Sequence, residues 1–112
     1  MGLLSKAANF VTPDSLEEII SRYHEENHTI NCIFLDNPGA EDGGFCKRIS
    51  EMINSAGKVI PLSKGRPLIL LAPGMDRELI AHRLSRILKT APLLSFESDS
   101  PEKAINSIKT LA

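Results

Sequence analysis

The sequence predicts a single α+β domain in which one four-stranded mixed sheet packs against amphipathic helices. Three observations predict this class. Strand-like and helix-like stretches follow one another as β-α-β-β-α-β over residues 29–98. Only a short polar turn containing Lys64-Gly65 separates the second strand-like run from the third. A chain of 112 residues that is 42% hydrophobic also has the length and composition of one ordinary globular domain.

The short turn decides the expected topology. A parallel crossover needs a dozen or more residues, so the runs at 58–63 and 66–72 must pair antiparallel. The natural arrangement is a ferredoxin-like split β-α-β sheet with strands one and three in the centre, which we expect to run parallel. Pro61 places the second strand at an edge. The alternative is a three-layer flavodoxin-like sandwich with one antiparallel excursion.

The strand-like runs differ in how deeply they should be buried. Residues 29–35 and 66–72 are apolar at nearly every position, which indicates strands buried on both faces. Residues 92–98 alternate, as a half-exposed strand does. Additional helices at the two ends of the chain should therefore cover the second face of the sheet.

The whole chain, 1–112, divides into four expected segments. Residues 1–13 form a helical or linker-like arm, 14–28 a leading helix, 29–98 the β-α-β-β-α-β unit and 100–112 a terminal helix. Two helices lie inside the unit, and Gly57 should end the first of them. Their expected core-facing residues are Phe45, Ile49, Met52, Ile53 and Ala56 in the first, and Leu79, Ile80, Leu84, Ile87 and Leu88 in the second.

Composition argues against several partners. The net charge is −1, so no overall field attracts nucleic acid or anionic lipid. One Tyr and four Phe are too few for a base-stacking surface. The longest apolar stretch, "LILLAP", is too short to cross a membrane. Cys32 and Cys46 fit no metal or redox spacing, and their apolar surroundings favour buried thiols in the cytoplasm.

Two Pro-Gly loops follow the first and third strands and give the first candidate site. Because those strands are expected to run parallel, both loops should lie at one rim of the sheet. The candidate ligand-binding residues there are Asp36, Asn37, Gly39, Glu41, Asp42 and Asp76. Asp42 and Asp76 each precede a helix, which favours helix capping over ligand binding. The glycine spacing lacks the lysine of a phosphate loop, and no specific metal or cofactor pattern is present.

The segment Asp36-Asn37-Pro38-Gly39 resembles the binding loop of ACT domains. ACT domains share the ferredoxin-like fold and sense amino acids. The resemblance implies that a small organic ligand could bind at this loop.

Basic residues form the second candidate site. His82, Arg83 and Arg86 fall on the predicted outward side of a helix, with Lys89 just beyond, and Lys64 and Arg66 flank the turn. Such a run is typical of a solvated face, and its functional interpretation is a contact surface for an acidic protein.

Enzymatic activity is the least favoured class. Cys46 lies in a helix's first turn beside Lys47 and Arg48, which would lower a thiol pKa. No sequence feature brings a base to it, so we expect a buried structural thiol. The leading hypothesis is a small cytoplasmic, non-enzymatic regulatory or protein-interaction module, which includes self-association through an exposed strand edge or the terminal helices. The alternative is a small-ligand or divalent-metal sensing domain that uses the loops at 36–44 and 72–76.

Overall fold

The computed structural model describes residues 13–37 and 43–111 of the chain. The expected arm at 1–13 therefore lies almost wholly outside the described residues. The same holds for three residues of the candidate ligand site, Gly39, Glu41 and Asp42.

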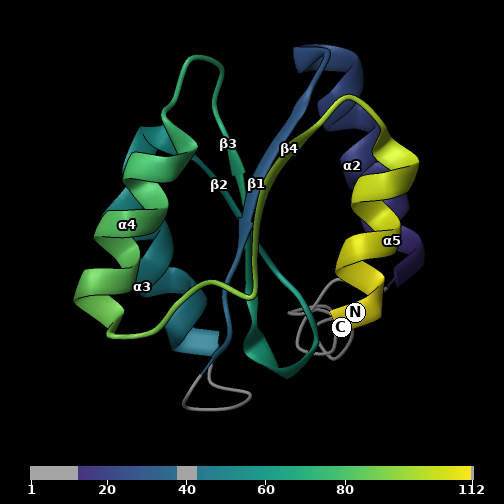
Figure 1. Cartoon of the computed structure of the whole chain (residues 1–112). Coiled ribbons are helices and arrows are strands. Elements are labelled where there is room, and N and C mark those ends of the chain that lie inside the picture. Colours follow the sequence, from purple (N-terminus) through teal and green to yellow (C-terminus); the bar gives the residue numbers. More distant parts are fainter. Residues whose placement is uncertain (1–12, 38–42, 112) are drawn as a thin grey trace.

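The described residues form a compact α+β domain with four strands and four α-helices (Figure 1). The elements follow the expected order of leading helix, β-α-β-β-α-β unit and terminal helix. They are α2 (Pro13–Asn27), β1 (Ile30–Phe34), α3 (Gly43–Ile53), η1 (Asn54–Ala56), β2 (Gly57–Pro61), η2 (Ser63–Gly65), β3 (Pro67–Leu71), α4 (Arg77–Leu88), β4 (Leu94–Ser98) and α5 (Pro101–Leu111). None of the described helices is long and apolar enough to cross a membrane.

The sheet has the strand order β2-β3-β1-β4 and is antiparallel at every pairing. The expectation of a mixed sheet with parallel central strands is therefore wrong. In β1 and β3, Cys32 lies opposite Leu70 and Phe34 lies opposite Leu68 in antiparallel register. The error has a simple cause: a β-α-β crossover makes β2 parallel to β1, and the following hairpin then reverses β3. A flavodoxin-like sheet requires parallel neighbours, so that alternative is also wrong, although its three layers are present.

The predicted hairpin between β2 and β3 is confirmed. Ile60 lies opposite Leu68 in antiparallel register. Lys64 and Gly65 both have positive φ angles, 65° and 68°, which tighten the turn. Pro61 ends β2 at the edge of the sheet, as predicted, where a residue without an N–H can be accommodated.

Helices cover both faces of the sheet: α3 and α4 lie on one side, and α2 and α5 lie on the other (Figure 1). The alternating side chains of β1 supply both cores. Cys32 and Phe34 join the core under α2 and α5, whereas Ile33 and Leu35 join the core under α3 and α4. Every residue of β3 is buried. The prediction that the two central strands are buried on both faces is therefore confirmed.

Four sequence assignments within the helices need correction. Met52, Leu79 and Ile87 were expected in the core but are exposed, with relative exposures of 41%, 45% and 65%. Gly57 does not end α3 but begins β2, after a 3₁₀ turn at Asn54–Ala56. A Cβ atom on Gly57 would lie 2.6 Å from the carbonyl oxygen of Leu70, so the close approach of β3 requires glycine there.

Candidate functional site

The described residues at the starts of the two predicted loops, which were expected to share a rim, lie at opposite ends of the sheet. Asp36 and Asn37 follow β1, and Asp76 lies beyond the end of β3. Because β1 and β3 are antiparallel, their carboxyl ends lie at opposite ends of the sheet. Asp36 and Asp76 therefore cannot contribute to one binding site, and the predicted composite rim is wrong.

Asp36 and Asn37 instead bind the chain around the hairpin turn. The Nε atom of Arg66 donates to Oδ1 of Asp36 at 3.0 Å, and Nη1 of Arg66 donates to the carbonyl of Leu111 at 2.7 Å. Asn37 is buried, and its Nδ2 donates to the carbonyl of Gly65 at 3.1 Å. We call these residues, Asp36, Asn37, Gly65 and Arg66, the hairpin clamp. They join the end of β1 to the β2–β3 turn and the end of α5.

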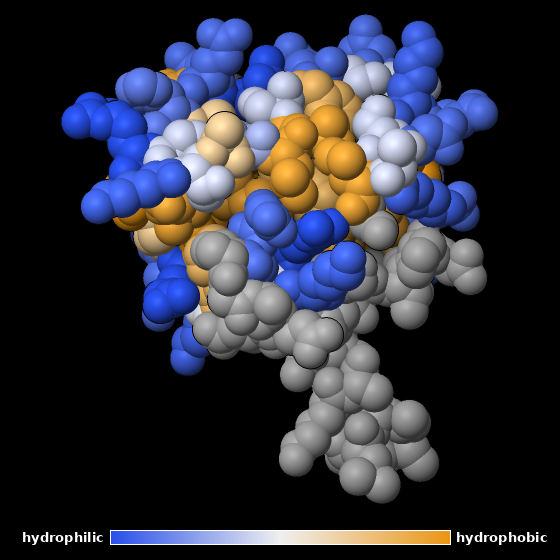
Figure 2. All heavy atoms as spheres, turned by 60° about the horizontal axis from the view of Figure 1, so that its bottom comes forward, coloured by the Kyte–Doolittle hydropathy of each residue, from blue (hydrophilic) through white to orange (hydrophobic). Residues whose placement is uncertain are grey.

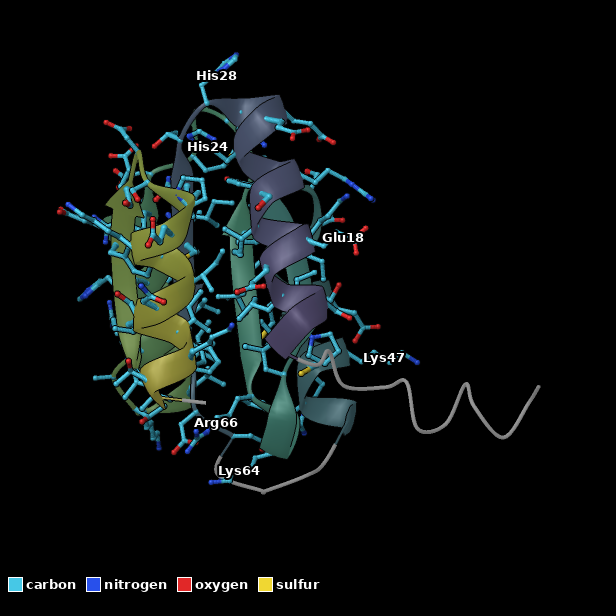
Figure 3. All side chains as sticks on the ribbon, turned by 90° about the vertical axis from the view of Figure 1, so that its right-hand side faces the viewer. Glu18, His24, His28, Lys47, Lys64 and Arg66 are labelled. Atoms are coloured by element: carbon cyan, nitrogen blue, oxygen red, sulfur yellow. The ribbon has the colours of Figure 1, made fainter. Side chains whose placement is uncertain are left out.

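This arrangement corrects the assignment of Arg66 to the basic partner surface. Its side chain is only 18% exposed and is committed to Asp36 and Leu111. Lys64 remains exposed in the turn. Figure 3 shows Lys64 and Arg66 at the same end of the molecule.

Cys46 is buried next to the hairpin clamp. Its Sγ atom donates to the carbonyl of Gly65 at 3.3 Å. Figure 3 shows His24 and His28 at the end of α2 that lies away from Lys47, the neighbour of Cys46, so α2 brings no imidazole to the thiol. The predicted burial of Cys46 is confirmed.

Asp76 caps α4, as its position before the helix predicted. Its Oδ1 accepts a hydrogen bond from the backbone N–H of Leu79 at 3.1 Å. Within residues 13–37 and 43–111, no cluster of three or more His, Cys, Asp or Glu side chains has the proximity that a metal ion requires. The two described acids beyond the strand ends instead have structural partners: Asp36 pairs with Arg66, and Asp76 accepts from the N–H of Leu79.

The outward side of α4 carries most of the predicted basic residues. His82, Arg83, Arg86 and Lys89 are all exposed, as expected. Within the part of the chain that the structure describes, none of these four forms an ion pair. Leu79 and Ile87 are exposed beside these basic residues, because Leu79 lies three and four positions before His82 and Arg83, and Ile87 lies four positions after Arg83. We call these six residues the α4 outer face.

Sequence reasoning missed the apolar part of the α4 outer face. The buried positions of α4 are Ala81 and Leu84, with Ile80 and Leu88 partly buried against the same core. A helical wheel places Leu79 about 140° from Leu84 and among His82, Arg83 and Arg86. The position of Leu79 on the wheel indicated exposure, but its hydrophobicity led to its assignment to the core.

A cleft of about 490 Å³ lies on the other side of the sheet, between α2 and the strands β2 and β3. Ile19, Ile60 and Leu70 contribute apolar walls, and Arg22, Glu26 and Lys58 contribute charges of both signs. Tyr23 also lines it and donates its hydroxyl to the carbonyl of Leu71. Burial raises the pKa of Tyr23 above its ordinary value. No sequence pattern indicated this cleft.

No known family, curated protein or solved structure matches this chain. The fold and the surfaces just described define a small three-layer α+β domain with an exposed basic and apolar helix face.

Proposed function

We propose that the protein is a non-enzymatic protein-interaction module that contacts an acidic partner through the α4 outer face. One observation carries the proposal: Leu79 and Ile87 are 45% and 65% exposed, and basic side chains surround them. Leu79 and Ile87 lie eight positions apart on one helix, roughly 12 Å along its axis, so one partner can cover both side chains.

The chemistry of this face favours a particular kind of partner. Covering Leu79 and Ile87 would remove apolar surface from water and drive association. Arg83 and Arg86 have no ion pair among the described residues, so acidic side chains could approach them without displacing an existing partner. Arginine is enriched at interfaces, and complementary charge guides the encounter. An acidic segment with apolar residues fits this face best.

We infer a ferredoxin-like topology, and the strand order β2-β3-β1-β4 with antiparallel neighbours supports it. Both intervening helices, α3 and α4, lie on one face of the sheet. Ferredoxin-like domains serve many functions, so the fold does not choose among them. A regulatory role in the cytoplasm is consistent with two buried cysteines held as thiols.

The sensing alternative loses its geometric basis at the predicted loops, since Asp36 and Asp76 lie at opposite ends of the sheet. The cleft beside α2 has a volume within the range of small-molecule sites. A ligand-sensing function would therefore use Tyr23 and Lys58 rather than the Pro-Gly loops. Thermal shift measurements against a small-molecule library test this second candidate, because a bound ligand stabilises the folded state.

Site-specific crosslinking tests the interaction function. A photoreactive amino acid replaces Leu79 in one variant and the exposed Glu51 of α3 in a matched control. After irradiation in cells that produce the protein, the Leu79 variant should form a discrete adduct and the Glu51 variant should not. Adding Arg83→Glu and Arg86→Glu should abolish the adduct, whereas Lys103→Glu on α5 should leave it unchanged.

Two results would contradict the proposal. One is the absence of any adduct at position 79 while position 51 crosslinks efficiently. The other is an adduct at position 79 that survives both charge reversals, because the basic residues would then contribute nothing to recognition.

A further inference from the structure

The outer edge of β4 exposes backbone hydrogen-bonding groups. Among the strands of the described residues, β4 is at the end of the sheet and has β1 as its one neighbour. The backbone N–H of Leu35 donates to the carbonyl of Pro67, so the backbone groups at position 35 point toward β3. Backbone groups alternate in direction along a strand, so those of Cys32 point toward β4, where Cys32 lies opposite Phe96. The N–H and C=O groups of Phe96 therefore point to β1, and those of Ser95 and Glu97 point away from the sheet.

Two side chains of opposite charge, Arg77 and Glu97, lie beside this edge. Nη1 of Arg77 donates to Oγ of Ser95 at 2.6 Å, so the guanidinium lies next to Ser95. Nε of Arg77 is buried and has no hydrogen-bond partner. Glu97 is exposed and forms no ion pair within the described residues. The guanidinium of Arg77 therefore lies beside position 95 of the edge strand, and the carboxylate of Glu97 lies two positions further along it.

We propose that a second copy of this chain pairs with this edge, with the two β4 strands antiparallel across a two-fold axis at Phe96. Ser95 of one copy then lies opposite Glu97 of the other, and each pair exchanges two backbone hydrogen bonds. The same register brings Glu97 of each copy to the Arg77 that is bonded to the opposite Ser95. The edge is therefore complementary to itself, as a two-fold interface requires.

The axis position follows from the charges. An axis at Glu97 would place two carboxylates directly opposite each other, which destabilises a strand pair. An axis at Ser95 would place Glu97 opposite Leu93 and leave the acid without Arg77. Only the axis at Phe96 pairs Ser95 with Glu97, whose backbone groups point outward, and brings the carboxylate of Glu97 to the guanidinium of Arg77 in the other copy. It also places the two Phe96 rings opposite each other at a closely spaced, non-hydrogen-bonded position, where aromatic pairs interact well.

The surface around this edge also suits a partner. In Figure 1, β4 is the strand nearest the viewer, with β1, β3 and β2 behind it. Figure 2, in which the bottom of Figure 1 comes forward, shows an apolar area bordered by polar side chains. Leu93, Leu94 and Phe96 are only partly buried against the core under α2 and α5. Pairing of two edges would cover part of this apolar surface and join the sheets of both copies.

Charge exchange combined with sedimentation equilibrium tests this inference. The purified chain should have twice its mass of 12.3 kDa at high micromolar concentration. Glu97→Arg alone and Arg77→Glu alone should each weaken the dimer about tenfold or more, because each opposes like charges. Glu97→Arg with Arg77→Glu should restore dimerisation, because the exchanged charges again attract. Glu51→Arg on α3 is the matched control and should remain dimeric.

A second variant tests the backbone pairing. Ser95→Pro removes an N–H that points away from β1, so it should preserve the fold and abolish the dimer. Circular dichroism spectra serve as the check that every variant is folded. In hydrogen exchange, the amides of Ser95 and Glu97 should become protected as concentration rises.

A monomeric wild type would overturn the inference, as would a dimer insensitive to Ser95→Pro or not restored by the exchanged charges. Arg83→Glu with Arg86→Glu should leave the dimer intact. This separates the β4 interface from the function proposed for the α4 outer face.

Discussion

Arg66 and Asp36 join the end of β1 to the hairpin turn through a 3.0 Å ion pair between Nε and Oδ1. The Arg66 side chain is 18% exposed and that of Asp36 is 48% exposed. This pair gives Asp36, at the end of β1, a structural role. It also accounts for one acid that the sequence suggested as a ligand.

We expect Asp36→Asn to lower the free energy of unfolding by about 0.5–1.5 kcal/mol, because a mostly buried guanidinium loses its charged partner. Urea denaturation measures the change. Glu18→Gln is the matched control, since it removes an ion pair with Arg22 whose side chains are 72% and 70% exposed. That change should cost less than about 0.5 kcal/mol. Equal effects in the two variants would show that the Asp36–Arg66 pair contributes no more than a surface pair.

Leu70 and Leu79 provide a second comparison. Leu70 is 3% exposed in a central strand, so Leu70→Ala should lower the free energy of unfolding by about 2–5 kcal/mol. Leu79 is 45% exposed, and Leu79→Ala should change it by less than about 1 kcal/mol. Denaturant midpoints for both variants check the prediction. A larger loss for Leu79→Ala would place that residue in the core, where the sequence first suggested it.

Asp76 provides a test of helix capping. Asp76→Ala should lower the free energy of unfolding by about 0.5–2 kcal/mol, because the N–H of Leu79 loses its acceptor. Asp76→Asn keeps a side-chain oxygen that can accept this bond and should retain most of the stability. Thermal unfolding of the three proteins separates the outcomes. Comparable losses in both variants would mean that the negative charge, rather than the hydrogen bond, stabilises α4.

Cys32 should make stability depend on pH under alkaline conditions. Burial raises the pKa of its thiol from 9.0 to about 12, although the charge of Arg77 opposes this shift. Below pH 9 the thiol is protonated in the folded and in the unfolded chain, so its full contribution to the free energy of unfolding is present. Above that pH the unfolded chain loses the proton first, and the free energy of unfolding falls until the pH reaches about 12.

The measurement is the free energy of unfolding at several alkaline pH values, compared with Cys32→Ala. Both proteins carry Tyr23→Phe, because the raised pKa of Tyr23 acts in the same direction. The Cys32→Ala protein should show the shallower decline. Identical slopes would show that Cys32 ionises equally readily in the folded and unfolded chains.

Much of the fold could be predicted from local pattern. The order of elements, the β2–β3 hairpin and the edge position of Pro61 follow from short-range rules on turns and proline. The cap at Asp76 also depends only on neighbours in the sequence. Such features need no knowledge of how distant segments meet, which is why the residues themselves indicated them.

The errors arose where long-range geometry decides the outcome. The direction of β3 relative to β1 depends on the crossover and the hairpin together, and one wrong step placed Asp36 beside Asp76. The pairing of Arg66 with Asp36 joins residues 30 positions apart, so charge alone made Arg66 resemble a surface residue. Leu79 and Ile87 were assigned to the core by hydrophobicity, whereas their angular position on α4 exposes them.

The direction of β3 relative to β1 determines which candidate sites can exist, so it is the central claim to test. Nuclear Overhauser contacts between Hα atoms are strong only across closely spaced antiparallel pairs. We predict such contacts between Cys32 and Leu70 and between Phe34 and Leu68, which are opposite each other at non-hydrogen-bonded positions. Their absence, together with contacts that place Phe34 beside Leu70, would indicate parallel strands and return the two Pro-Gly loops to one rim.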